Sequence, residues 1–426
     1  MIESMRNAAL FIPWLFFCAW ARAQEEQILT LEQCFEEALH QSESLAIQEE
    51  SIRIAEAQYE QALGGVLPHL ALEGSNRFQD TIQSDSGSSV GSTFTRSSTP
   101  EAAVTLTQPL FQGFRKIRSL KIAHAEEKKT SLERDRAIQL LYLDVAQAYI
   151  ATLQLEKDLE ILDSIYETLN QRTQELQERI RLGKSRESEI LSIHSELART
   201  QGEREKTRRL LQSARDLLSF LRGKETQEKL VDEIALPEKI PSVESFLTPL
   251  PLRPDLQATH QAVEMAQGRL LYEKGARWPT VDLSGKYYLY RVGFWEDIRW
   301  DATFSLNFPL YSGGEIKGRI LEAQATLRQT ELARREALRR SDLEVRQFYH
   351  NWAASESLQK SLEEAESYAA ADYQSHVKEY RVGWVNNLDV LQSLRDWQER
   401  QREWNGTFYQ TKLDYLQLKT ATGEMP

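Results

Sequence analysis

The sequence contains few cysteines, a deficit of positive charge and no catalytic motif. Two cysteines, Cys18 and Cys34, occur among 426 residues. The seven histidines are scattered, and neither a His-Glu-x-x-His nor a Cys-x-x-Cys motif is present. We therefore expect no enzyme activity, no cofactor and no metal site. The formal net charge of −12 also argues against nucleic acid as a partner, because nucleic-acid binding favours a basic surface.

Residues 1–23 have the features of a signal peptide for export. Arg6 precedes an apolar core over residues 8–19, and Ala21-Arg22-Ala23 matches the small-residue pattern of a cleavage site. Lipidation of Cys18 is an alternative, but the two phenylalanines before this cysteine do not fit a lipidation motif. We therefore expect a mature chain that begins at Gln24.

Beyond that segment the sequence lacks any apolar run long enough for a spanning helix. No later stretch contains 18 consecutive apolar residues. An exported chain of this kind is soluble, peripheral or a transmembrane β-barrel. Cleavage after Ala23 leaves Cys34 as the only cysteine, which excludes an intrachain disulfide. We expect Cys34 to be a small packed residue rather than a nucleophile.

Proline and glycine are both absent from residues 115–181, which indicates an uninterrupted helix. Apolar or small residues recur there at alternating spacings of three and four, the pattern of coiled-coil packing. At about 1.5 Å per residue, this helix would be about 100 Å long. A return helix is expected over about 187–221. The second half repeats this plan, with helices over about 316–381 and 388–418.

Two segments change from the helical period to strict alternation, which predicts two β-hairpins. They cover about 68–109 and about 279–309. The end of the first hairpin, Pro109-Leu110-Phe111, lies 200 residues before Pro309-Leu310-Tyr311, which indicates an internal duplication. Four prolines mark the predicted crossovers between helix and strand: Pro68, Pro109, Pro279 and Pro309.

These patterns divide the mature chain into a first repeat over 24–223, an irregular connector over 224–254 and a second repeat over 255–426. The predicted fold class is mainly α with a β-barrel contribution, since each chain supplies four strands. Four strands leave two open edges, and in lipid only a closed barrel satisfies the backbone. If these strands span a membrane, several chains must share one barrel. The alternative is an amphipathic hairpin pair packed on a soluble helical core.

Several short motifs in this order resemble the outer membrane efflux proteins, the TolC-like family. The resemblance covers nearly all of the mature chain. Its motifs are Leu29-Thr30-Leu31-Glu32, Leu252-Arg253-Pro254-Asp255-Leu256, the two proline-flanked hairpins, Arg181-Leu182-Gly183, and Tyr380-Arg381-Val382-Gly383 followed by Leu388-Asp389-Val390-Leu391.

This resemblance implies a homotrimer in the outer membrane of a Gram-negative bacterium. Twelve strands would form one barrel, continued by a long α-helical tunnel across the periplasm. Such channels contact outer-membrane lipid and dock to a periplasmic adaptor, also called a membrane fusion protein. The adaptor joins them to an inner-membrane pump of the RND or ABC type. The channel is then a passive exit duct for efflux or for type I secretion.

The resemblance also implies roles for residues at the predicted helical tips. Asp389 matches an acidic position of the periplasmic gate, and Glu189 is equivalent to it by the repeat. Gln392 occupies a position where the family often has a second acidic residue, which halves the expected ring charge. An alternative for Asp389 is a helix-start carboxylate stabilised by the helix dipole. The residues expected to make the tip turns and contact an adaptor are Arg181, Leu182, Gly183, Arg381, Val382 and Gly383.

Two other classes of protein remain open from the residues themselves. A periplasmic coiled-coil adaptor should interrupt its coiled coil with a lipoyl-like β domain, and no such segment is evident. An exported structural coiled-coil protein without a pore leaves the two aromatic-rich hairpins unexplained. The export channel accounts for both the helices and the hairpins.

Overall fold

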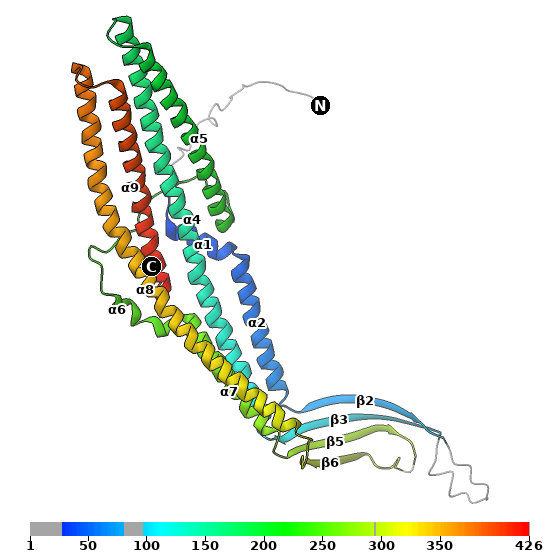
Figure 1. Cartoon of the computed structure of the whole chain (residues 1–426). Helices are drawn as coiled ribbons and strands as arrows, with labels where there is room; N and C mark the ends of the chain where they lie inside the picture. The colour runs from blue at the N-terminus through cyan, green and yellow to red at the C-terminus, as the bar shows by residue number, and fades with distance from the viewer. Residues whose placement is uncertain (1–27, 81–96, 294, 426) are drawn as a thin grey trace, which may run out of the picture.

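The computed structural model describes residues 28–80, 97–293 and 295–425. The predicted signal peptide and Cys18 lie outside these residues, as does much of the connection within the first hairpin. The chain forms one elongated body, with two pairs of long helices at one end and a β-sheet at the other (Figure 1). The end of the chain and the short helix α6 lie about midway between them (Figure 1).

Long helices account for most of the chain and appear twice in the same order. The helices of the first half are α1 (Leu31–Gln41), α2 (Glu43–Gly64), α4 (Arg115–Arg181) and α5 (Glu187–Arg222). Those of the second half are α7 (Pro254–Gly275), α8 (Glu315–Val382) and α9 (Asn387–Thr422). The capping box expected at Thr30 and Gln33 starts α1. In the described residues, no helix combines the length and apolarity needed to cross a membrane.

The helices lie side by side in a defined order that changes along the molecule. Near the sheet, α2 packs on α4, α4 on α7, and α7 on α8. Toward the opposite end, α5 packs on α4, α4 on α9, and α9 on α8. The longest helices, α4 and α8, therefore run through both halves of the length (Figure 1).

The core consists of separate clusters along the helices, as expected for an elongated molecule. One cluster lies near the middle of the elongated molecule and includes Tyr149, Cys34 and Leu218. A second lies near the helical tips and includes Leu169, Leu176 and Leu391. Much of the apolar pattern predicted along 115–181 is buried in these clusters, and Val345 and Trp352 of α8 are buried in a third.

Four strands form one antiparallel sheet in the order β2–β3–β5–β6. They are β2 (His69–Phe78), β3 (Ser98–Gln112), β5 (Thr280–Arg291) and β6 (Trp300–Asn307). The two hairpins thus join through β3 and β5, which come from different repeats. Within the described residues, β2 and β6 are edge strands with one neighbour each.

The prolines at the predicted crossovers differ in their positions. Pro68 and Pro279 directly precede β2 and β5, and Pro309 lies two residues beyond β6. The sequence pattern predicted that Pro109 would end its strand. This prediction is wrong, because β3 continues to Gln112. The strand tolerates this proline because the pairing with β5 shifts register between Pro109 and Phe111.

The segment predicted as an irregular connector over 224–254 contains short ordered elements. Strand β4 (Lys229–Leu230) pairs in parallel with β1 (Ile28–Leu29). Helix α6 (Val243–Leu247) and a 3₁₀ turn (Leu250–Leu252) follow, and α7 begins within this range at Pro254. The Tyr149 hydroxyl lies 2.7 Å from the carbonyl oxygen of Leu29 and 2.6 Å from that of Val231, which ties both strands to α4.

Candidate functional site: the helical tips and the helix–strand junction

Each pair of long helices turns at a glycine in a left-handed conformation. Gly183 follows α4 with a φ of +69°, and Gly383 follows α8 with a φ of +86°. A side chain at either glycine would meet open space, so only the backbone conformation demands glycine there. These residues make the tip turns at the end of the molecule farthest from the sheet (Figure 1).

The two turns present apolar side chains to solvent. Leu182 and Val382 are exposed, and Trp384 is 81% exposed. Trp384 lies 200 residues after Lys184 and was missed by the sequence reasoning, although a tryptophan directly after a turn glycine is a recognisable signal. Exposed aromatic and aliphatic side chains of this kind are typical anchors of protein interfaces.

Glu189 connects the tip between α4 and α5 to the tip between α8 and α9. Its Oε2 accepts hydrogen bonds from the Tyr380 hydroxyl at 2.9 Å and from the Ser185 hydroxyl at 2.7 Å. The predicted gate residue Glu189 on α5 is thereby joined to the end of α8. Burial raises the pKa of Tyr380, so its hydroxyl remains a hydrogen-bond donor at neutral pH.

Two arginines of α4 lie against the ring of Tyr380. The guanidinium carbon of Arg172 lies 4.8 Å from the ring centroid, and that of Arg179 lies 4.6 Å away. Arg172 is buried and donates a hydrogen bond to Asn387 Oδ1 of α9 at 3.2 Å. Arg381 lies 3.9 Å from Glu175, which adds a weaker link between the tips. Tyr380 is therefore fixed by contacts with α4 and α5.

The predicted gate residue Asp389 lies in the first turn of α9 and bonds to the residue that caps this helix. Its Oδ2 accepts a hydrogen bond from the backbone N–H of Asn386 at 3.0 Å, and Asn386 Oδ1 accepts one from the N–H of Asp389 at 3.1 Å. This is a capping box, so the helix-start role of Asp389 is present in the single chain. Gln392 is exposed and donates a hydrogen bond to Asp396 at 3.0 Å, which places a carboxylate beside the amide.

A polar seam continues from the tips along α5 and α9. The Glu196 side chain is buried and accepts hydrogen bonds from Arg199 at 2.9 Å and from Arg395 of α9 at 2.7 Å. Further along, Arg402 lies 3.3 Å from Glu203. The two helical pairs are thus joined by these ion pairs in addition to the apolar cluster around Leu169 and Leu391. Because the Glu196 carboxylate is buried, separating it from both arginines would be costly.

At the other end of the helices, Gly113 and Gly275 approach one another closely. Gly113 precedes α4 with a φ of +60°, and Gly275 is the last residue of α7. A Cβ atom on either glycine would overlap the backbone of the other. One residue past Phe111, Gln112 donates a hydrogen bond to Asp282 at 2.6 Å. The crossover from helix to strand is therefore built around a contact between the two repeats.

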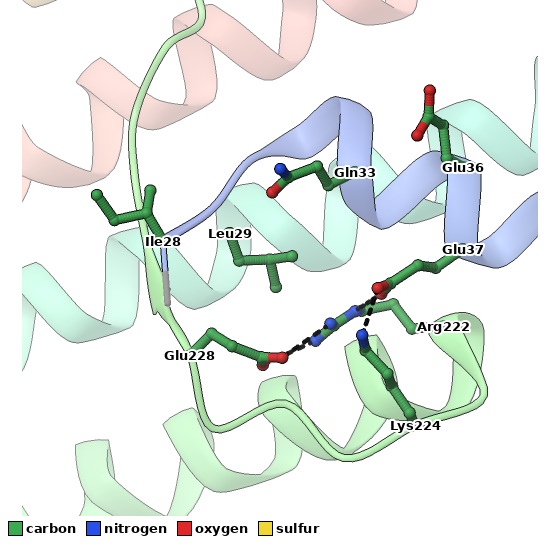
Figure 2. A pocket seen from close by; sticks show the side chains of 8 residues that line it. All are labelled: Ile28, Leu29, Gln33, Glu36, Glu37, Arg222, Lys224 and Glu228. Atoms are coloured by element: carbon green, nitrogen blue, oxygen red, sulfur yellow. Dashed lines mark hydrogen bonds and ion pairs between the residues drawn. The ribbon is translucent and has the colours of Figure 1, made fainter. Parts of the chain in front are cut away.

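An ion cluster midway along the molecule anchors the first repeat (Figure 2). The Arg222 side chain is fully buried, with a relative exposure of 0%. Its Nε donates to Glu37 at 2.6 Å, its Nη1 to Thr226 at 2.9 Å, and its Nη2 to Glu228 at 3.2 Å. Figure 2 shows Lys224 also pointing at Glu37. A cavity of about 320 Å³ opens beside this cluster.

Cys34 lies next to this cluster and is fully buried. Burial raises the pKa of its thiol to about 12, so the thiolate needed for nucleophilic chemistry is not formed near neutral pH. The expectation that Cys34 is a packed residue agrees with this environment. Among the described residues, no group of three or more His, Cys, Asp or Glu side chains is arranged to hold a metal ion.

Arg253, of the motif Leu252–Leu256, has an equivalent anchoring role in the second repeat. Its side chain is buried, forms two hydrogen bonds with Asp255 at 2.7 and 2.8 Å, and contacts Glu344 of α8 at 2.7 Å. It also donates to the carbonyl oxygen of Ala421 at 2.9 Å. A cation at the C-terminal end of a helix is favourable, so Arg253 fixes the end of α9 against α8.

Solved structures share this fold at low sequence identity. The outer membrane protein VceC from Vibrio cholerae has a TM-score of 0.81 and 18% identity, with 92% of this chain and 96% of that chain covered. The Campylobacter jejuni CmeC outer membrane channel has a TM-score of 0.80 and 14% identity, with coverages of 92% and 85%. The open state of the Neisseria gonorrhoeae MtrE outer membrane channel has a TM-score of 0.78 and 19% identity, with coverages of 92% and 89%.

Paired long helices fused to an edge-exposed antiparallel sheet define the fold class of outer-membrane channel subunits, as these neighbours show. The outer membrane efflux protein family matches residues 34–224 and 250–424. The chain belongs to the outer membrane efflux protein family, and the resemblance read from its motifs is confirmed. No curated protein sequence matches this chain significantly.

We expect valine at Gly383 to impair export without preventing assembly of the protein. A β-branched residue at a φ of +86° is strained by about 1–2 kcal/mol. This strain would distort the exposed tip turn. The same holds for Gly183. The measurement is whether the variant complements a strain that lacks the gene, together with the native mass of the purified protein.

Gly202 provides a matched control for this substitution. It lies within α5, where an added side chain also meets open space, but its backbone is helical. Gly202→Val should retain export. Loss of assembly in Gly383→Val would show instead that this glycine serves folding alone.

Proposed function

We propose that three copies of this chain form an outer-membrane exit duct with a long periplasmic tunnel. The observation that carries this proposal is the sheet of four strands with free edges at β2 and β6. Three such sheets would supply twelve strands and close one barrel, which removes all edges. Exposed apolar side chains on the sheet support lipid contact: Leu70, Leu72, Leu289, Phe304 and Leu306.

The helices would continue this barrel as a tunnel through the periplasm. From the start of α8 to its tip turn there are 68 residues, which at about 1.5 Å per residue is about 100 Å. The duct would itself be passive, because the chain contains no recognised catalytic motif. Its substrates would be driven by an inner-membrane pump of the RND or ABC type, in efflux or in type I secretion.

The tips would form both the periplasmic gate and the contact with an adaptor. The bond between Tyr380 and Glu189 holds α8 against α5 and supports a closed arrangement of the tips. Opening of the tips would also have to break the ion pairs of Glu196 with Arg199 and Arg395. Trp384, Leu182 and Val382 supply the exposed apolar surface on which helical tips of a periplasmic adaptor would dock.

At the narrow end of the tunnel, three copies of Asp389 would form an acidic ring. Asp389→Ala is expected to weaken block of the channel by a trivalent cation such as La³⁺ by about tenfold or more, since about 1.4 kcal/mol of lost attraction is sufficient. The readout is the concentration that halves the conductance of the purified protein in a planar bilayer.

The matched control is Asp216→Ala, which removes an exposed carboxylate of α5 far from the tips. This variant should be blocked like the wild type. If the Asp389 variant and the wild type are blocked equally, Asp389 does not contribute to the gate and only caps its helix.

The proposed assembly is tested by the native mass of the full-length protein extracted from outer membranes in mild detergent. A trimer is expected, with the protein absent from the soluble periplasmic fraction. A monomer in the soluble fraction would contradict the proposal and favour the exported coiled-coil alternatives.

A further inference from the structure

The order of elements in the chain determines which surfaces of two copies would meet. Near the sheet the helical order is α2–α4–α7–α8, and the strand order is β2–β3–β5–β6. In both the helical layer and the sheet, one edge comes from the first repeat (α2 and β2) and the opposite edge comes from the second repeat (α8 and β6). In a closed ring, α8 of one copy must therefore face α2 of the next.

Helix α2 carries a regular stripe on the side turned away from α4. Its buried residues Leu45 and Ala55 face the chain, whereas the stripe recurs at spacings of three and four on the opposite side. Every residue of the stripe is exposed, and Ile47 is 64% exposed. The stripe consists of Glu43, Ile47, Glu50, Ile54, Ala57 and Gln61.

Helix α8 carries a stripe of opposite charge on the side turned away from α7. Its buried residues Ile320 and Ala323 face the chain. Leu332, at the centre of the opposite face, is 59% exposed. The exposed residues on and beside this stripe are Leu321, Ala325, Arg328, Leu332, Arg335, Glu336, Arg339 and Leu343. Glu336 is the one acidic residue among them, and it pairs with Arg340 at 4.0 Å.

The two stripes match in level as well as in charge. Counted from the helix ends at the sheet, Ile47 and Leu332 both lie 17 residues away, or about 25 Å. To within one residue of the same count, Glu50 comes level with Arg328 (14 and 13 residues) and Glu43 with Arg335 (21 and 20 residues). Figure 1 shows that both helices reach the sheet at the same end of the molecule.

The charges on these stripes are available for contacts with another copy. Within the described part of the chain, Arg328, Arg335 and Glu43 have no ion-pair partner. Glu50 pairs with Arg53 at 2.5 Å on the exposed surface, and such surface pairs contribute little stability. Glu50 can therefore exchange this partner for an arginine of the next copy.

We propose that the α2 stripe of one copy packs on the α8 stripe of the next copy in this register, with Ile47 on Leu332 flanked by Glu50–Arg328 and Glu43–Arg335. This inference rests on the proposed assembly and adds its residues, direction and register. A two-fold dimer would place arginine stripes or glutamate stripes on one another, which like charges disfavour. The stripes thus select head-to-tail closure into a ring.

Oxidative cross-linking of paired cysteines tests the contact in the full-length protein in its membrane. The double variant Ile47→Cys/Leu332→Cys is expected to give disulfide-linked dimers and trimers. Each single variant should give none, because the introduced thiol would face an unchanged Ile47 or Leu332 of the next copy. Cys34 does not interfere, because it is fully buried. Chains carrying one introduced cysteine each should cross-link when they are expressed together.

The matched control is Gln61→Cys/Leu332→Cys. Gln61 lies on the same stripe but 14 residues closer to the sheet than Ile47, or about 20 Å away. Equal cross-linking of this pair, or cross-linking of a single variant with itself, would overturn the proposed register and direction. So would absence of cross-links in a double variant that still has the mass of a trimer. A wild-type protein that is monomeric would contradict the proposed assembly instead.

Charge reversal provides an independent measurement. Arg328→Glu/Arg335→Glu is expected to lower the temperature at which the trimer dissociates in detergent, and the further changes Glu43→Arg/Glu50→Arg should restore it. An unchanged dissociation temperature after the arginine changes, or no recovery with the second pair, would contradict an electrostatic role for the stripes.

Discussion

Replacing Arg222 with alanine is expected to lower the free energy of unfolding by about 3 kcal/mol, because it removes a buried side chain and leaves the partly buried Glu228 without its cation. Arg222 is fully buried and bonds to Glu37, Thr226 and Glu228. It also joins the end of α5 to α1 and to the residue before β4, so its loss would loosen the middle of the molecule. The measurement is urea-induced unfolding of the purified protein, followed by helical circular dichroism.

Arg208→Ala is the matched control on the same helix. Arg208 pairs with Glu205 at 2.8 Å, but both side chains are more than half exposed. Its loss should cost at most about 1 kcal/mol. Equal effects of the two substitutions would show that burial of Arg222 does not determine its contribution.

The same cluster predicts a dependence of stability on pH. Hydrogen bonds from Arg222 hold the pKa of Glu228 at about 2, below its ordinary value of 4.5. A lowered pKa in the folded state contributes stability above the unfolded value, and this stability is lost as the pH falls from 4.5 toward 2. The Glu228→Gln variant should show a smaller decrease across this range in the same unfolding measurement.

The second large effect is expected for Gly275→Ala, at the junction of helix and strand. The added methyl group would overlap the backbone of Gly113, which cannot move without displacing the start of α4. We expect a loss of about 2 kcal/mol or more and a decreased yield of assembled protein. Heat-induced unfolding and native mass measure these two effects.

The internal repeat supplies a control for this substitution. Gly64 is the last residue of α2, as Gly275 is of α7, and both precede a strand by the same spacing. A Cβ atom at Gly64 meets no neighbour within 4 Å. Gly64→Ala should be neutral or stabilising by up to about 1 kcal/mol. A similar loss in both variants would contradict the role of the contact between Gly113 and Gly275.

Local sequence pattern predicted the long helices well because their signal is repeated many times. The spacing of three and four along 115–181 corresponds to α4, and the glycines at 183 and 383 follow the helices they were expected to end. The order of the strands could not be predicted in this way, because it depends on the pairing of β3 with β5. That pairing joins residues about 180 positions apart. No local period reports such a contact.

The errors of the sequence interpretation have physical causes. Pro109 was placed at a strand end because proline cannot donate to a ladder, but a register shift accommodates it within β3. The segment 224–254 appeared irregular because of its prolines, yet β4 pairs there with β1. Two-residue strands have no detectable period, so only the distant partner defines them.

The candidate site was only partly visible in the sequence. The repeat pointed to Glu189, but its bond to Tyr380 joins residues 191 positions apart and depends on how the two helical pairs lie together. Asp389 was identified from the family motif, and its capping bond to Asn386 is local enough to predict. Arg222 directly follows the return helix predicted over about 187–221, and the sequence carried no signal of its burial.

The most direct test of the account is the conductance of the purified full-length protein in a planar lipid bilayer. Discrete channels of low conductance are expected in the wild type, because the proposed closed arrangement of the tips would be stabilised by the bond between Tyr380 and Glu189. Tyr380→Phe removes the hydroxyl that makes this bond and should increase the conductance. A correctly folded protein that inserts into the bilayer and gives no channels in either form would contradict the central claim that this chain forms an export duct.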